Sequence, residues 1–166
     1  MLAVEKLTLR FEDTLISVTD FIIRKAEVDD LPAITRVRQS VRENLLLPHQ
    51  LAARGITEAS VAASLSNSAE GWVVEVGGEI VGFAIADRED RELFALFVTP
   101  AFEGRGIGSR LHDVAVAWLW GSGAQSILLS TGKGTEAAGF YERRGWFKVG
   151  VDPFGDIRYQ RNRVSD

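Results

Sequence analysis

Three alternating glycines, Gly104, Gly106 and Gly108, separate an apolar segment from an amphipathic one, and this junction constrains the fold more than any other feature. Residues 92–98 (ELFALFV) are apolar on both faces, which predicts a buried central strand. Downstream, as far as Gly121, apolar residues recur at helical spacing: Ile107, Leu111, Val114 and Trp118. The junction therefore predicts a buried strand that turns directly into a helix.

The segments before this junction predict antiparallel strands. Residues 72–76 and 79–85 flank Gly77-Gly78, which predicts a hairpin with a two-residue turn because glycine tolerates the positive φ angles of such turns. Nearer the N-terminus we expect a strand at 21–24, a helix through about residue 41, a loop or short helix over 44–55, and a helix capped by Thr57.

The segments after the junction alternate between strands and a helix. A strand at 126–130 is followed by a helix at about 135–144, and strands are expected at 146–149 and 157–160. A strand–helix–strand crossover among hairpin strands predicts a mixed α/β fold with a mostly antiparallel sheet.

One mixed α/β domain over residues 21–166 is therefore expected, and residues 1–20 form an N-terminal extension of unclear structure.

Composition excludes several classes of protein. Nineteen basic and 23 acidic residues give a net charge of −4, which argues against a nucleic-acid partner. The chain has no cysteine and only two histidines, so we expect no metal centre. No apolar run approaches the ~20 residues of a membrane span, and residues 1–20 are unlike a secretory signal. We therefore expect a soluble cytoplasmic protein without a membrane partner.

The glycine junction is suited to holding a phosphate. Glycines bring backbone N–H groups close to a ligand, and the N-terminus of the following helix favours an anion. Arg105 and Arg110 can add positive charge. A glycine-rich turn without a ligand remains the alternative interpretation.

Two other phosphate-binding motifs fit the sequence poorly. A dinucleotide fingerprint needs a glycine where Ser109 stands, so a dinucleotide-binding oxidoreductase is a distant alternative. A triphosphate loop needs Ser or Thr where Gly134 follows Gly132-Lys133.

Two segments together resemble the GNAT superfamily of acetyl-CoA-dependent N-acetyltransferases. LFVTPAFEGRGIGSRL (96–111) is similar to the family's acyl-CoA-binding motif, and AAGFYERRGW (137–146) is similar to its second signature. The sequence departs from these motifs at Glu103, where the family has Gln or Arg, and at Gly134, where Asn is frequent.

The resemblance implies a GNAT-like fold with six to seven strands, one parallel crossover and about four helices. It implies transfer of an acetyl group from acetyl-CoA to a primary amine of a small molecule, peptide or protein, by direct attack in a ternary complex. A non-catalytic acyl-CoA-binding sensor is the alternative function, and a homodimer is compatible with the family.

The resemblance also implies which residues bind acetyl-CoA. The central strand splays from its neighbour in the family, which frees main-chain groups near Phe97 and Val98 for the pantetheine amides. The pyrophosphate then lies on the glycine turn: Gly104, Arg105, Gly106, Ile107, Gly108 and Ser109.

Two residues are candidates for catalysis. Tyr141 matches the family's helix tyrosine, whose phenol can protonate the leaving thiolate, although it could instead only pack in the core. Glu92 has the spacing of a catalytic base, and burial beside Phe83 and Phe94 would raise its pKa. The alternative is an exposed carboxylate paired with a neighbouring arginine, Arg88 or Arg91.

Several other side chains have two interpretations each. His49 is conceivable as a proton relay but is expected to be a solvent-facing loop residue, and His112 is expected to be partly exposed on its helix. Arg36, Arg38 and Arg42 could recognise an anionic acceptor or form a solvated helix face. The identity of the acceptor does not follow from these residues.

Overall fold

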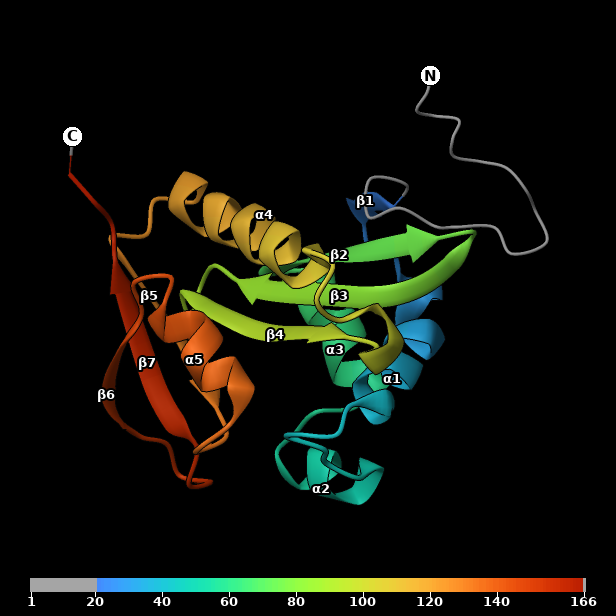
Figure 1. Ribbon diagram of the computed structural model, residues 1–166, viewed down its shortest axis with the longest axis horizontal. Helices are drawn as coiled ribbons and strands as arrows, with labels where there is room; N and C mark the ends of the chain where they lie inside the picture. The colour runs from blue at the N-terminus through green and yellow to red at the C-terminus, as the bar shows by residue number, and fades with distance from the viewer. Residues whose placement is uncertain (1–20, 166) are drawn as a thin grey trace.

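A computed structural model describes residues 21–165 of the chain (Figure 1), so the expected extension, 1–20, lies outside the described residues. The described part contains one seven-stranded sheet with the order β1-β2-β3-β4-β5-β7-β6. Its strands are β1 (Ile22–Lys25), β2 (Ala69–Val76), β3 (Glu79–Asp87), β4 (Glu92–Val98), β5 (Ser126–Thr131), β6 (Phe147–Val151) and β7 (Ile157–Asn162).

The α-helices of residues 21–165 are α1 (Leu31–Ser40), α2 (Pro48–Ala53), α3 (Glu58–Leu65), α4 (Ile107–Gly121) and α5 (Glu136–Glu142). Two short 3-10 helices, η2 (Val28–Asp30) and η3 (Pro100–Phe102), complete the described elements. As expected, the Thr57 hydroxyl caps α3 by accepting from the Ser60 backbone N–H at 3.0 Å. Pro48 begins α2, where its missing N–H costs no helical hydrogen bond.

The strand pairing confirms the mixed sheet. Every pair of neighbouring strands is antiparallel except β4 and β5, which are parallel and are connected through α4. The predicted hairpin joins β2 to β3 through Gly77 and Gly78, whose φ angles are +58° and +82°. Such positive angles at both central residues are those of a turn that matches the twist of the strands.

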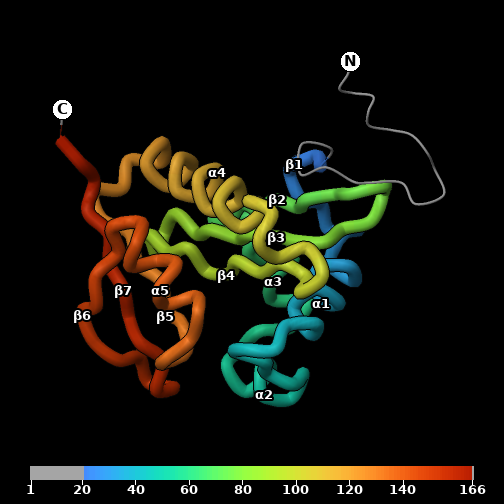
Figure 2. Tube along the Cα trace, in the orientation of Figure 1, coloured from blue at the N-terminus to red at the C-terminus, as the bar shows by residue number. Residues whose placement is uncertain are grey.

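Helices cover both faces of the sheet. On one face α4 and α5 bury a core that includes Leu111, Leu119 and Tyr159. On the other face α1 and α3 pack over a second core around Val73 and Phe83. The ribbon and the tube show β1 to β4 on one side of the molecule and the later strands, in orange to red, on the other (Figures 1 and 2).

An irregularity in β4 decides which way its side chains point. Ala95 pairs with Ile85 and Leu93 pairs with Ala86, so Phe94 has no partner on β3 and forms a bulge. Leu93 belongs to the core under α4, whereas Ala95 and Phe97 pack on the α1 side. The bulge therefore turns Phe97 away from the face that Leu93 occupies.

The parallel pair β4–β5 is joined only at its beginning in the described chain. Glu92 and Leu128 are the registered residues, and the Leu128 N–H donates to the Arg91 carbonyl oxygen at 2.8 Å. Beyond this point no registered pair joins the two strands within residues 21–165. The strands therefore diverge toward Val98 and Thr131, as the family resemblance implied.

Candidate active site

A cleft of about 1890 Å³ opens where β4 and β5 diverge. The glycine turn before α4 forms part of its wall, and residues of α1, the α1–α2 loop, β4 and α5 are among the others that line it. Pockets for single drug-sized ligands have volumes of roughly 300–1,000 Å³. This cleft therefore has room for more than one ligand of that size.

The glycine turn presents bare backbone to the cleft. Gly104 and Gly106 have φ angles of +76° and +83°, and a Cβ on either residue would meet no atom within 4 Å. Gly106 is the N-cap of the 15-residue helix α4 and supplies no side-chain hydrogen bond to its first N–H groups. Those N–H groups and the helix dipole are suited to an anion, which fits a pyrophosphate.

The other residues of the turn have different positions. The Ile107 side chain is buried in the core, so only its backbone can contact a ligand. The Arg105 guanidinium lies 4.9 Å from the centroid of the Phe102 ring. Ser109 accepts a hydrogen bond from Arg144, which follows α5, and so its hydroxyl already has a protein partner.

Gly108 lies where α4 packs closely against β4 and α5. A Cβ there would lie 3.9 Å from Val98 Cγ2 and 4.0 Å from the Phe140 ring. The start of α4 is therefore in contact distance of the end of β4 and of α5. The turn, β4 and α5 form one continuous surface, along which Phe97, Val98 and Tyr141 also line the cleft.

Tyr141 is both buried and at the cleft. Its side chain is 7% exposed, and no residue in the range 21–165 forms a hydrogen bond with its hydroxyl. Burial raises the pKa of Tyr141 well above its ordinary value, and the nearby Arg144 opposes the rise only in part. The phenol is therefore neutral and keeps a proton that it can donate into the cleft.

His112, expected to be partly exposed, is instead 1% exposed and packs against Tyr141. Its Nε2 accepts a hydrogen bond from the Trp146 indole N–H at 3.0 Å, so the ring proton lies on Nδ1 and points to Asp113. Burial lowers the pKa of His112, while Asp113 opposes this effect. The prediction of partial exposure was wrong because the helix positions of Ala115 and Leu119 place His112 on the same buried face.

Glu92 is partly buried, and its ionic partner is neither Arg88 nor Arg91. Its Oε2 accepts from Nη1 of Arg158 on β7 at 2.7 Å, and the same nitrogen donates to the Ser130 hydroxyl at 3.0 Å. Burial raises the pKa of Glu92, and this effect exceeds the opposing effect of Arg158. The direction of this effect agrees with the expectation, whereas the partner, Arg158, was not indicated by the sequence.

The α1–α2 loop crosses the cleft and touches the β5 side. The Asn44 side-chain amide donates to the Thr131 hydroxyl at 3.1 Å, and a Glu43 carboxylate oxygen accepts from the backbone N–H of Glu136 at 2.9 Å. A Cβ on Gly132 would overlap the Asn44 amide oxygen, so a larger residue there would make the Asn44 side chain shift. His49, in α2, is exposed and does not line the cleft.

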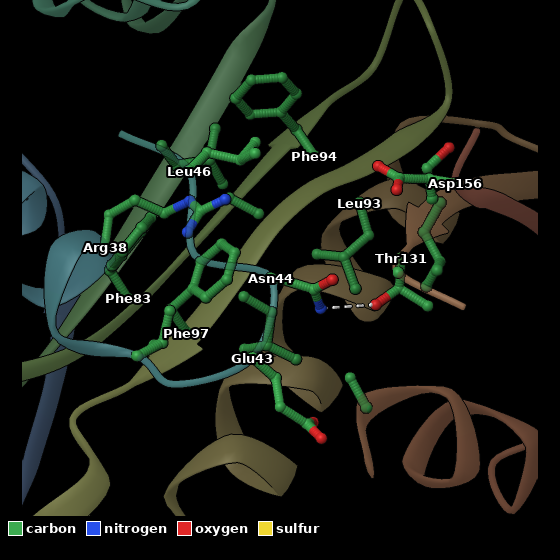
Figure 3. Close-up of a pocket in the computed structure, with 18 of the residues that line it drawn as sticks. Arg38, Glu43, Asn44, Leu46, Phe83, Leu93, Phe94, Phe97, Thr131 and Asp156 are labelled. Atoms are coloured by element: carbon green, nitrogen blue, oxygen red, sulfur yellow. Dashed lines mark hydrogen bonds between the residues drawn. The ribbon is translucent and has the colours of Figure 1, made fainter. Parts of the chain in front are cut away.

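A second group of charges lines the cleft beside this loop and includes Arg38, one of the three arginines expected as candidates for an anionic acceptor (Figure 3). Its other members, Arg54 and Asp156, were not indicated by the sequence. The Arg38 guanidinium lies 4.1 Å from the centroid of the Phe97 ring. Arg54 pairs with Asp156 at 3.0 Å and lies 4.6 Å from the centroid of the Phe154 ring. Arg36, on the same helix as Arg38, is exposed and outside the cleft.

No helix within residues 21–165 is long and apolar enough to cross a membrane. No group of three or more candidate metal ligands occurs among the side chains of that range.

Comparison with known proteins identifies the family. The model of the acetyltransferase (GNAT) family matches residues 36–146, about two thirds of the chain. The chain therefore belongs to the GNAT acetyltransferase family, a family of acyltransferase enzymes.

Two curated relatives match part of the sequence. An uncharacterized N-acetyltransferase of Methanocaldococcus jannaschii is 35% identical over 85 residues, which are 45% of this chain and 38% of the relative. The mycothiol acetyltransferase of Propionibacterium freudenreichii is 34% identical over 82 residues, 45% of this chain and 26% of the relative. The similarity thus spans well under half the length of these relatives.

Solved structures share the fold across most of the chain. The PaiA N-acetyltransferase of Thermoplasma acidophilum, solved in complex with coenzyme A, has a TM-score of 0.68 at 17% identity, covering 86% of this chain and 99% of its own. The ribosomal-protein-S18-alanine N-acetyltransferase of Escherichia coli has a TM-score of 0.68 at 18% identity, covering 88% and 96%.

Proposed function

We propose that the protein transfers the acetyl group of acetyl-CoA to a primary amine by direct attack in a ternary complex. The observation that carries this proposal is the opening of the bare glycine turn onto the same cleft as Tyr141 and Glu92. Membership of an acetyltransferase family and a structural neighbour in complex with coenzyme A support it.

Acetyl-CoA is assigned to the cleft between β4 and β5. The pyrophosphate would lie on the backbone N–H groups of the turn from Gly104 to Ser109, where helix α4 begins. The pantetheine arm would follow the diverging part of β4, where the main-chain groups of Phe97 and Val98 have no partner strand on the β5 side. Such groups need hydrogen-bond partners, and the amides of the pantetheine arm can supply them.

Tyr141 is assigned as the general acid. The amine nitrogen attacks the thioester carbonyl, and collapse of the tetrahedral intermediate breaks the C–S bond and releases a thiolate. The raised pKa of Tyr141 keeps its O–H intact until that moment, and transfer of this proton to sulfur completes the free thiol. Tyr141 regains a proton from solvent after the thiol has left, while the proton of the attacking amine passes to Glu92.

Glu92 is assigned as the base that receives the proton of the attacking amine, directly or through one water. An alkylamine has a pKa of about 10.4, so most of it is protonated at neutral pH and cannot attack. Burial raises the pKa of Glu92 and so strengthens it as a base, whereas Arg158 keeps a useful fraction ionised.

The experiment that tests the function measures free thiol released from acetyl-CoA with a panel of primary amines. Amine-dependent release and intersecting initial-rate plots would support direct transfer in a ternary complex. Tight binding of acetyl-CoA without amine-dependent thiol would instead indicate an acyl-CoA-binding sensor.

A further inference from the structure

The guanidinium of Arg38 lines the cleft and has no ionic or hydrogen-bond partner among residues 21–165. Its Nη1 atom is buried, and it makes no hydrogen bond within residues 21–165. A buried charged donor without a partner costs considerable free energy. The remainder of the partly exposed guanidinium lines the cleft, so a bound molecule can supply the ionic partner that residues 21–165 do not.

The charged groups near Arg38 do not neutralise its positive charge. Asp156 is the nearby carboxylate, and its Oδ2 already accepts from Arg54 at 3.0 Å. Burial and the positive charge of Arg54 both lower the pKa of Arg38, while the more weakly acting Asp156 opposes them. The three groups together therefore carry one uncompensated positive charge.

The surroundings of Arg38 strengthen any ion pair made there. The guanidinium stacks over Phe97, and the side chains of Phe83 and Leu46 lie close to it in the same region of the cleft (Figure 3). Apolar walls lower the local dielectric constant, so a paired anion is bound more tightly than at an exposed arginine. Stacking on Phe97 also holds the planar guanidinium in one orientation.

Given the proposed acetyl transfer, on which this step rests, we infer that the acceptor is an amine that carries a carboxylate, and that Arg38 binds this carboxylate. A carboxylate matches the flat fork of donors on a guanidinium and brings the single negative charge that the site lacks. A phosphate dianion would bring a second negative charge next to Asp156.

Arg38 is not placed to bind the cofactor's phosphates. The glycine turn begins α4, which covers the opposite face of the sheet from α1, the helix that carries Arg38 (Figure 1). Cations nearer the turn include Arg105, Arg110 in the first turn of α4, and Arg144. Arg38 therefore belongs to the acceptor side of the cleft.

The test compares matched acceptors that differ only in the carboxylate. The standard α-amino acids, their amides and their decarboxylated amines are offered with acetyl-CoA, and O-phosphoethanolamine represents a phosphate. For the preferred side chain, the wild-type kcat/KM should be roughly 10- to 100-fold higher for the acid than for its amide, the range of one charge-assisted hydrogen bond. Arg38→Met should reduce this ratio toward one.

Arg36→Met is the matched control, because Arg36 is exposed two residues earlier on α1. It should leave the ratio at the wild-type value. A CoA-dependent rise in melting temperature reports that each variant is folded.

A binding measurement separates this inference from the proposed function. The N-acetylated amino acids are titrated against wild type and Arg38→Met in the presence of CoA, with calorimetric detection. Binding that Arg38→Met loses, without any amine-dependent thiol release, would support the carboxylate site and contradict the catalytic function. Three results would overturn the inference. The first is thiol release at equal rates with acids and with their amides, and the second is a preference for acids that Arg38→Met retains. The third is that no carboxylate binds.

Discussion

Oε2 of Glu92 lies 2.7 Å from Nη1 of Arg158, at the end of the cleft where β4 and β5 are still joined. The arginine reaches the carboxylate from β7, past the intervening strand β5, where it also contacts Ser130. Burial and this pair act on Glu92 in opposite directions, and burial has the larger effect on its pKa. The pair thus moderates a carboxylate that would otherwise hold its proton more tightly.

Glu92→Gln should lower kcat at neutral pH by about 10²-fold, the low end for general base catalysis. The deficit should shrink as pH rises, because the free amine then loses its proton without help. Rates of thiol release between pH 6 and 10 check this. A deficit of constant size across that range would contradict the role of a base.

Arg158→Met should raise the pKa of Glu92 further, because the carboxylate loses the cation that stabilises its charged form. The acidic limb of the kcat/KM profile should therefore move to higher pH. The measurement needs an acceptor amine of low pKa, so that the amine does not titrate over the same range. An unmoved limb would show that Glu92 does not set the profile.

Tyr141→Phe should reduce turnover by roughly 10²-fold with little change in acetyl-CoA affinity, because only the proton donor is removed. The loss should be smaller for an acyl donor with a more acidic thiol, which needs less protonation on leaving. Since the ring is retained, the melting temperature should change little. Wild-type turnover, measured where chemistry limits the rate, would assign Tyr141 to packing alone.

Gly106→Trp should abolish the CoA-dependent rise in melting temperature by filling the space above the turn. The substitution also strains a backbone with a φ angle of +83°, so a control with equal strain is needed. Gly78→Trp provides it, because Gly78 has a φ angle of +82°, equally open surroundings and a place in the β2–β3 hairpin. Comparable loss of CoA binding in both variants would contradict the assignment of the turn.

His112→Asn should make the melting temperature less sensitive to acid. Burial lowers the pKa of His112 in the folded protein, so below its unfolded value of about 6.5 the unfolded chain binds a proton that the folded chain does not. Stability from the neutral histidine is therefore present above that pH and is lost as pH falls toward the folded pKa. Melting curves from pH 7.5 to 5 should fall more steeply for wild type, and parallel curves would refute this.

Local patterns were enough to predict most of the fold. The Gly77-Gly78 hairpin, the Thr57 cap and the glycine turn depend on residues close together in the chain, and all three occur as expected. His112 was misplaced although a local signal existed: it lies three residues before Ala115 and seven before Leu119, on the core face of α4. If the apolar stripe of this helix had been drawn to include Ala115 and Leu119, it would have predicted the burial of His112.

The charged part of the site depends on contacts between distant segments. Arg158 meets Glu92 from 66 residues away, and no local pattern indicates that pairing. Arg38 meets Phe97 because the bulge at Phe94 turns Phe97 toward α1. Strict alternation along β4 would have kept Phe97 on the same face as Leu93. One extra residue in β4 thus determines that Phe97 meets Arg38 of α1.

The contact between Asn44 and Thr131 has a consequence for how the acceptor specificity of this protein can change during evolution. The two halves of the sheet are joined by backbone pairing at one end of their opening, and the Asn44 amide and the Glu43 carboxylate bond across it near the other. Residues 43 and 44 supply no proposed catalytic group, yet both contact the opposite side of the opening. Substitutions there can change the range of accepted molecules while leaving the reaction chemistry intact, so acceptor choice and catalysis can evolve separately.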